Sequence, residues 1–157
     1  MNTRTLHIAP VKRRIVVNVP PARAFEVFTA GVDRWWPKKA HIGATAPREI
    51  EIEPRLGGRW IEHGSDGEDT VVGHILVWEP PHRFVVSWEI DCHWQPDSEV
   101  ATEVEVCFID VPPDSTRVEL EHRGFERMGA DDGNTLRGSV DGGWPGMLDH
   151  FKTAAET

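Results

Sequence analysis

The chain has 157 residues, with 26 Asp and Glu against 17 Lys and Arg, and a formal net charge of −9. This length suits one domain with its own hydrophobic core, and we predict a single domain over residues 1–157 with its core at about 11–153. The acidic balance argues against a nucleic acid or a membrane as partner. Without an apolar run of about 18 residues or an N-terminal signal-peptide core, we expect a cytoplasmic protein.

The first part of the chain predicts one strand and two short helices. The segment VKRRIVVNV at 11–19 is rich in β-branched residues, which favours a strand. The two prolines at 20–21 end it and can begin a helix, because proline is tolerated in a first turn. Phe25 and Phe28 recur at helical spacing. A second short helix follows, and Pro37 ends it.

Between residues 48 and 124 the hydrophobic pattern changes to a period of two, which is typical of antiparallel strands with one buried face. In EVATEVEVCFIDV at 99–111, Val104 and Val106 alternate with glutamates, and we expect the glutamates on the solvated face. Turn sequences rich in glycine or proline separate the segments, such as RLGG and PPDS. The pattern predicts an antiparallel sheet of about six to seven strands, most of them linked by hairpins.

The C-terminal segment predicts an amphipathic helix. Its apolar residues recur at steps of three and four and form one stripe: Trp144, Met147, Leu148 and Phe151. We expect this helix to begin near Val140, with Pro145 in its first turn, and residues 125–138 to form a loop with one short helix. Since the sheet needs a cover for its apolar face, this helix is the expected cover, and the fold class is α+β.

Seven tryptophans and no tyrosine in so short a chain suggest more than an ordinary core. Large rings with a single N–H donor suit the walls of an internal apolar cavity. The alternative is that they pack against one another and leave no space, as protein interiors usually do. The expected ligand-binding wall consists of Trp35, Trp60, Trp88, Val104, Val106, His122, Trp144, Met147 and Phe151, and either Trp35 or Trp36 is expected near the mouth.

Histidine is the main candidate for chemistry. The chain has eight histidines but no HxH or HExxH spacing. His122 shares the parity of the apolar residues on its strand and should face the interior, whereas the face of His74 is ambiguous. A cavity histidine can orient a ligand or act as a general base, and the alternative is a hydrogen-bonded structural histidine. His63 should face away from Trp60, and we expect neither a metal site nor a cofactor.

The two cysteines are not part of a CxxC pair. A hairpin that turns near residues 96–97 would place Cys92 opposite Ala101 and Cys107 opposite Val86. This register keeps the two sulfurs too far apart for a disulfide. We therefore predict two free thiols.

Five segments, taken together and in this order, resemble the START-like helix-grip superfamily, also called the birch-pollen-allergen-like or SRPBCC fold. They are GVDRWWP at 31–37, EPRLGGRW at 53–60, GHILVWEPPHRFVVSW at 73–88, VELEHRGF at 118–125 and GGWPGMLDHF at 142–151. The branch that they resemble most is that of the activator of heat-shock protein 90 ATPase. The resemblance implies a curved sheet wrapped around a long C-terminal helix, and a scaffold that binds a hydrophobic ligand or a partner.

From these observations we expect a non-catalytic domain whose internal cavity binds an apolar or aromatic small molecule. Two alternatives stay open. One is a cyclase- or hydrolase-type enzyme in which His122 or His74 moves a proton. The other is an interaction module that regulates a chaperone or another partner protein. A homodimer formed through the exposed first strand of the sheet is also left open.

Overall fold

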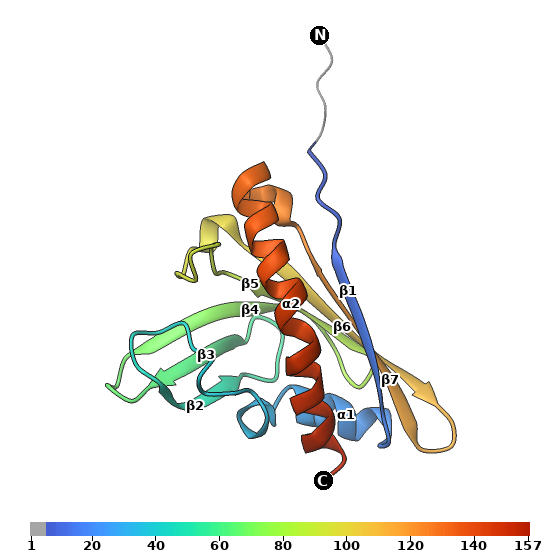
Figure 1. The fold of residues 1–157 in the computed structure, drawn as a ribbon. Helices are drawn as coiled ribbons and strands as arrows, with labels where there is room; N and C mark the ends of the chain where they lie inside the picture. Colours follow the sequence, from blue (N-terminus) through green and yellow to red (C-terminus); the bar gives the residue numbers. More distant parts are fainter. Residues whose placement is uncertain (1–5) are drawn as a thin grey trace.

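A seven-stranded antiparallel sheet curves around one long helix in the computed structural model, which describes residues 6–157 (Figure 1). This arrangement confirms the predicted helix-grip α+β fold. In chain order the elements are β1 (Val11–Val17), α1 (Pro21–Phe28), the 3-10 helix η1 (Val32–Arg34), β2 (Pro47–Ile52), β3 (Arg59–Gly64), β4 (Asp69–Glu79), β5 (Arg83–Trp88), the 3-10 helix η2 (Ser98–Val100), β6 (Thr102–Val111), β7 (Ser115–Arg123), the 3-10 helix η3 (Phe125–Met128) and α2 (Ala130–Ala155).

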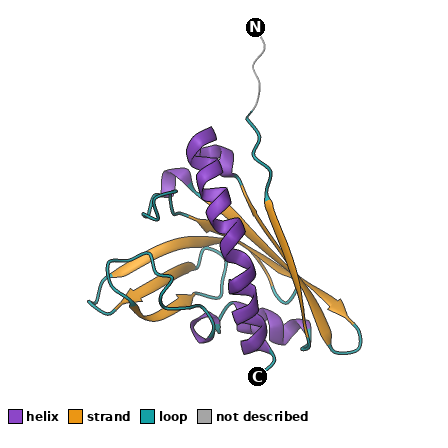
Figure 2. Ribbon diagram, viewed as in Figure 1, coloured by secondary structure: helices purple, strands orange, loops and turns teal. Residues whose placement is uncertain are grey.

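The strand order in the sheet is β1-β7-β6-β5-β4-β3-β2. Strands β2 to β7 thus follow one another as a meander, and β1 pairs with β7, so that β1 and β2 form the two edges. Figure 2 shows that the sheet bends strongly, with β2 and β3 on one side of α2 and β1 and β7 on the other. The bend leaves α2 lying along the concave face, with α1 near its C-terminal end.

Two positions in the sheet require glycine for different reasons, one for its positive φ and one for a close backbone approach. Gly57, in the turn between β2 and β3, has a φ of 77°, which favours glycine. Gly73 in β4 lies so close to β5 that a Cβ atom would be 1.7 Å from the carbonyl oxygen of Ser87. The pairing of β4 with β5 is also irregular between Ile75 and Val77, as expected for a β-bulge. Such bulges increase local twist and help to curve a sheet.

Helix α2 begins ten residues earlier than the sequence predicts, at Ala130 instead of Val140. The extra turns are polar on their outer side, so that their periodicity is weak, but Gly133 and Leu136 are buried. A Cβ atom at Gly133 would lie 2.3 Å from the carbonyl oxygen of Phe125, which explains why glycine suits this close contact. The predicted loop at 125–138 is therefore wrong except for the short helix η3.

Pro145 consequently lies inside α2 and not in its first turn. Proline has no N–H, so the carbonyl oxygen of Asp141, four residues earlier, loses its usual partner. Arg13 on β1 supplies a replacement, because its Nη2 donates a hydrogen bond to this oxygen at 3.2 Å. The same guanidinium forms an ion pair with the Asp141 carboxylate. The first strand thus supports the helix at the point where the proline interrupts its hydrogen bonding.

The connection between β5 and β6 is wider than the predicted hairpin. Val86 pairs with Val104, and Cys107 pairs with Arg83 instead of Val86. The register differs because residues 89–101 form a structured loop that contains η2 and its own bridge between Ile90 and Pro96. Both cysteines are free thiols, as predicted.

The outer face of the sheet carries the alternating glutamates, as predicted. Arg123 forms ion pairs with Glu103, Glu105 and Glu121, and Arg83 forms another with Glu105. These side chains are partly exposed, and such pairs contribute little each. Within residues 6–157, no helix combines the length and the hydrophobicity needed to cross a bilayer.

Candidate ligand-binding cavity

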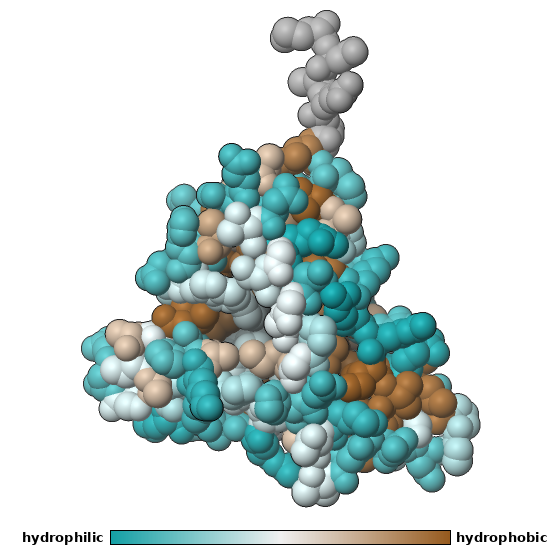
Figure 3. Space-filling model, in the orientation of Figure 1, coloured by the Kyte–Doolittle hydropathy of each residue, from teal (hydrophilic) through white to brown (hydrophobic). Residues whose placement is uncertain are grey.

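A cavity of about 220 Å³ lies between α2 and the concave face of the sheet. Its wall consists of residues from the loop at 36–42, from β2 to β5 and the loop after β5, and from positions 139–147 of α2. The space equals the liquid volume of about seven water molecules. The cavity is open on one side, and Figure 3 shows a hollow in the surface next to α2 with a hydrophobic patch beside it.

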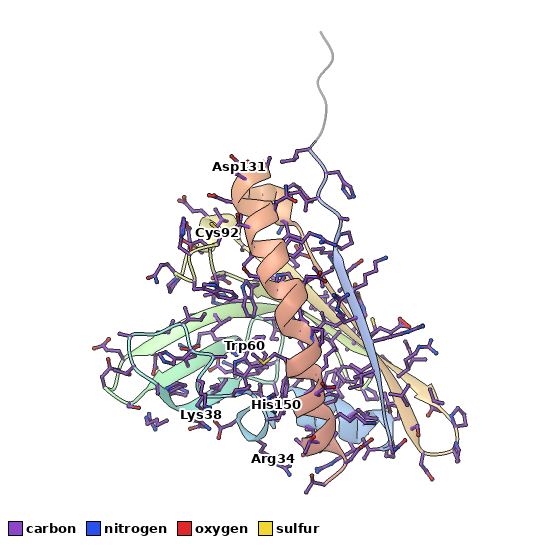
Figure 4. All side chains as sticks on the ribbon, in the orientation of Figure 1. Arg34, Lys38, Trp60, Cys92, Asp131 and His150 are labelled. Atoms are coloured by element: carbon purple, nitrogen blue, oxygen red, sulfur yellow. The ribbon has the colours of Figure 1, made fainter. Side chains whose placement is uncertain are left out.

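Four tryptophans of the wall form a closed ring of contacts. The ring centroids are 5.0 Å apart for Trp36 and Trp60, 5.8 Å for Trp60 and Trp88, 6.1 Å for Trp88 and Trp144, and 6.0 Å for Trp144 and Trp36. All four pairs meet edge to face, which is a favoured geometry for aromatic rings. Trp60 extends from β3 and lies beside α2 in Figure 4. The indoles therefore frame the space from both the sheet and the helix.

Two of these four indoles have partners inside the protein. The Nε1–H of Trp36 donates to the carbonyl oxygen of Ala40 at 3.3 Å, and that of Trp144 donates to His122 at 3.1 Å. Trp88 differs, because its buried Nε1 has no hydrogen-bond partner among residues 6–157. The hydroxyl of Thr45 is the one other buried side-chain polar atom without a partner in this part of the chain. Leaving a buried donor unpaired costs about 1–3 kcal/mol.

One carboxyl group belongs to the wall. Glu62 on β3 is 4% exposed and lines the cavity. Its oxygens accept the backbone N–H of Ile42 at 2.8 and 2.9 Å and that of Gly43 at 2.9 Å. These bonds attach the loop at 36–46 to the sheet, which places Ala40, His41 and Ile42 at the wall.

The other side of the cavity is bordered by the loop after β5. Trp94 lines the cavity yet is 41% exposed, so that it lies at the opening. Its φ of 62° is rare for a residue with a side chain. The Asp91 carboxylate holds this turn by accepting the backbone N–H groups of His93 and Gln95 at 2.8 and 2.9 Å. The local sequence thus fixes a large aromatic ring next to the opening.

His122 is completely buried, as its parity predicts, but it does not line the cavity. Both ring nitrogens are occupied, Nδ1 by the indole N–H of Trp144 and Nε2 by the hydroxyl of Thr102 at 2.7 Å. Burial lowers the pKa of His122 to about 3, so the ring is neutral at physiological pH. A neutral ring with both nitrogens engaged and no contact with the cavity has the features of a structural histidine.

The other two candidate histidines lie outside the cavity wall. The side chain of His74 is 45% exposed, and its Nδ1 lies 2.6 Å from Glu89. His63 lies on the opposite face from Trp60, as predicted, between Glu51 and Asp69 at 2.9 Å each. These acidic partners raise the pKa of His63. In the described part of the chain no three His, Cys, Asp or Glu side chains are grouped so that they could hold a metal ion.

The predicted wall residues are divided between the cavity and the surrounding core. Trp60, Trp88, Trp144 and Met147 line the cavity. Val104 and Val106 on β6 are buried in the core, but they do not line the cavity.

Two more predicted residues belong to a neighbouring aromatic cluster. Phe151 packs against Phe28 at 4.9 Å and against Trp35 at 5.6 Å, measured between ring centroids. The indole N–H of Trp35 donates to the carbonyl oxygen of Val27 at 2.9 Å, which directs this ring into the core. Its neighbour Trp36 therefore occupies the cavity wall.

Several wall residues were not predicted from the sequence. Glu62 shares the parity of Trp60 on the same strand, and Val140 precedes Trp144 by one helical turn. The spacing in the sequence could therefore have predicted both residues at the wall. The loop residues and Trp94 carried none, because their positions depend on contacts between segments distant in the sequence.

Comparison with known proteins places this geometry among related folds. The structure of an anthrahydroquino-γ-pyrone synthase, Txn09, is 38% identical, with a TM-score of 0.66, over 94% of this chain and 97% of that chain. CalC from Micromonospora echinospora, described as a self-sacrificing resistance protein, is 26% identical, with a TM-score of 0.67, over 93% of each chain. Protein MLL2253 from Mesorhizobium loti shares the fold at 18% identity, with a TM-score of 0.67 over 93% of this chain and 96% of that chain. Among curated proteins none matches.

The family comparison agrees with the resemblance noted in the sequence. A family model described as "Activator of Hsp90 ATPase homolog 1-like protein" matches residues 18–156, which is nearly the whole chain. The structural likeness to Txn09 and CalC likewise covers nearly the whole chain, 94% and 93% of it. The chain therefore belongs to the family of activator of Hsp90 ATPase homolog 1-like proteins, within the START-like helix-grip superfamily.

Proposed function

We propose that this domain binds an aromatic small molecule in the cavity. The observation that carries the proposal is the closed ring of four indoles, Trp36, Trp60, Trp88 and Trp144, around a space that opens to solvent. Aromatic faces and edges in fixed orientations favour a flat ring system as guest. A mostly apolar wall with few polar groups is typical of small-molecule sites.

The size of the cavity sets the expected affinity. A body of two fused rings fits a space of about 220 Å³, and a larger ligand would extend past Trp94 into solvent. Burying an aromatic group of this size removes about 150–250 Å² from water. At about 25 cal/mol per Å² this gives roughly 4–6 kcal/mol, or a Kd between about 1 mM and tens of micromolar. A simple two-ring hydrocarbon should therefore bind measurably but weakly.

The related structures support an aromatic ligand. Txn09, with 38% identity over nearly the full length of both chains, is named as a synthase of an anthrahydroquino-γ-pyrone, a polycyclic aromatic compound. This likeness supports the chemical class of the guest and leaves its identity open.

Titration with naphthalene, followed by calorimetry and by tryptophan fluorescence, tests the proposal. Gly143 and Gly142 provide a matched pair, because a Cβ atom at either meets no other atom within 4 Å, but only Gly143 lines the cavity. Gly143→Leu should weaken naphthalene binding at least tenfold, whereas Gly142→Leu should leave it within about twofold. The absence of saturable binding, or equal binding by both variants, would contradict the proposal. Native mass spectrometry of freshly purified protein would identify a co-purified guest.

A second candidate function is catalysis on the bound molecule. The 38% sequence identity to Txn09, which is named as a synthase, favours this alternative. His122 is a poor candidate for proton transfer because both its nitrogens are bonded within the protein. The carboxyl of Glu62 is the acidic group at the cavity wall. If a guest identified by mass spectrometry is converted on incubation, Glu62→Gln should reduce turnover more than binding. Unchanged turnover in this variant would exclude Glu62 from the reaction.

A further inference from the structure

One tryptophan of the cavity wall carries a polar group that has no hydrogen-bond partner among residues 6–157. Trp88, at the end of β5, is 5% exposed, and its Nε1–H makes no hydrogen bond within residues 6–157. An indole nitrogen can only donate, so a partner must offer an acceptor atom. Buried side-chain donors are nearly always paired, and an exception requires an explanation.

Three other indoles of the core differ from Trp88 in this respect. Trp35, Trp36 and Trp144 each donate to an acceptor of the protein. Trp88 is surrounded by the rings of Trp36, Trp60 and Trp144, which offer no strong acceptor, and by the ring of His122. Both nitrogens of His122 are already bonded to Trp144 and Thr102. Since Trp88 lines the cavity, a guest in the cavity is next to this residue.

The charge of the wall restricts the kind of acceptor. No lysine or arginine of the described chain lines the cavity, whereas the Glu62 carboxyl and the imidazole of His41 do, and Nδ1 of His41 is bonded to the carbonyl oxygen of Gly43 at 2.8 Å. An anionic acceptor would therefore enter without a permanent cation and close to another acidic group, which is unfavourable in a poorly hydrated site. A neutral oxygen avoids both costs.

We propose that the cavity selects aromatic ketones, whose neutral carbonyl oxygen accepts a hydrogen bond from Nε1–H of Trp88. The inference rests on the proposed function, that the cavity takes an aromatic guest, and adds the polar group that such a guest must carry. This hydrogen bond would supply orientation as well as affinity, because a single donor sets which edge of a flat guest is buried.

Chromone and naphthalene are suitable probes, since both are two fused six-membered rings and only chromone carries a carbonyl group. Chromone should bind the native protein about five- to tenfold more tightly than naphthalene, the effect of one hydrogen bond. Trp88→Phe keeps an aromatic ring without the donor and should abolish this ratio, which is read within the variant and does not depend on its affinity for naphthalene itself. Trp94→Phe, at the opening, is the control and should keep the ratio.

A direct measurement on the native protein complements the variants. The indole N–H resonance of Trp88, assigned through its own backbone amide, should move downfield with chromone and not with naphthalene. This result is obtainable even if Trp88→Phe does not fold.

The outcomes separate the two proposals. If neither probe binds, the aromatic cavity itself is contradicted. If naphthalene binds but chromone has no advantage, the selection of ketones is wrong while the proposed function stands. If the advantage persists in Trp88→Phe, the hydrogen bond from Trp88 is wrong while the proposed function stands. An unchanged Trp88 indole resonance in the chromone complex would also overturn the inference.

Discussion

The indole N–H of Trp144 on α2 donates a hydrogen bond to Nδ1 of His122 on β7, across 3.1 Å. Because an indole only donates, Nδ1 must be the unprotonated nitrogen, and the ring proton is on Nε2. Nε2 lies 2.7 Å from the hydroxyl of Thr102 on β6 and donates to it. The buried histidine thus joins the terminal helix to two strands, and it does so only in its neutral form.

This arrangement predicts a loss of stability in mild acid. Burial lowers the pKa of His122 from its usual 6.5 to about 3. The unfolded chain therefore binds a proton near pH 6.5 that the folded protein does not accept until about pH 3. Within this window the free energy of unfolding should fall as the pH falls, by up to about 1.4 kcal/mol per pH unit. Urea unfolding between about pH 5 and 6.5, above the range of most carboxylates, measures this slope.

The variant His122→Gln should flatten that slope, because an amide can accept from Trp144 and donate to Thr102 but does not titrate. His63→Gln is the control. The pKa of His63 is raised in the folded protein, so protonated His63 stabilises the fold below pH 6.5. This contribution is lost only as the pH rises through the folded pKa, which is above the measured window. An equally steep slope in His122→Gln would show that another group is responsible.

Truncation of Trp88 should strongly destabilise the protein. Its ring is 5% exposed and contacts Trp36, Trp60 and Trp144. Trp88→Ala should lower the free energy of unfolding by about 3–5 kcal/mol, which a thermal melt would record as a fall of roughly 10 °C or more. Trp94→Ala, at a ring 41% exposed, should change the stability far less. Similar melting temperatures for the two variants would contradict this interpretation.

Glu62 should control how firmly the loop at 36–46 covers the cavity. Glu62→Gln replaces one acceptor oxygen by an NH2 group that would face the N–H groups of Ile42 and Gly43. We expect a loss of about 1–3 kcal/mol in stability, faster hydrogen exchange at Ile42 and Gly43, and faster tryptic cleavage at Lys38. Glu51→Gln, on the opposite face of the sheet, should leave exchange in this loop unchanged. Loop protection that survives Glu62→Gln would show that other contacts hold the loop.

Two glycine variants should change stability in opposite directions. Gly73→Ala would place a Cβ atom 1.7 Å from the backbone of Ser87, so β4 and β5 must separate, with a loss of about 3 kcal/mol. In Gly142→Ala the new methyl group meets nothing within 4 Å, and alanine is the better helix former. This variant should gain about 0.5–1 kcal/mol. Urea denaturation gives both values, and a tolerated Gly73→Ala would refute the close approach of the two strands.

The sequence determined the fold class and most of the strands because alternation and helical periodicity are local properties. The parity of Val104 and Val106 identified the buried face of β6, and the spacing of Trp144, Met147 and Phe151 identified the second half of α2. The alternation along β3 also indicates that Glu62, two residues after Trp60, lies on the same face of the sheet as Trp60.

The tertiary structure alone decided the start of α2, the register of the β5–β6 connection and the choice of Trp36 over Trp35 at the cavity wall. Each depends on a contact between distant segments, such as the carbonyl of Phe125 against Gly133. Whether seven indoles fill an interior or frame a space depends on how far the sheet bends away from the helix. That distance is set by bulges and close backbone approaches, such as that of Gly73, which leave little trace in the periodicity of the chain.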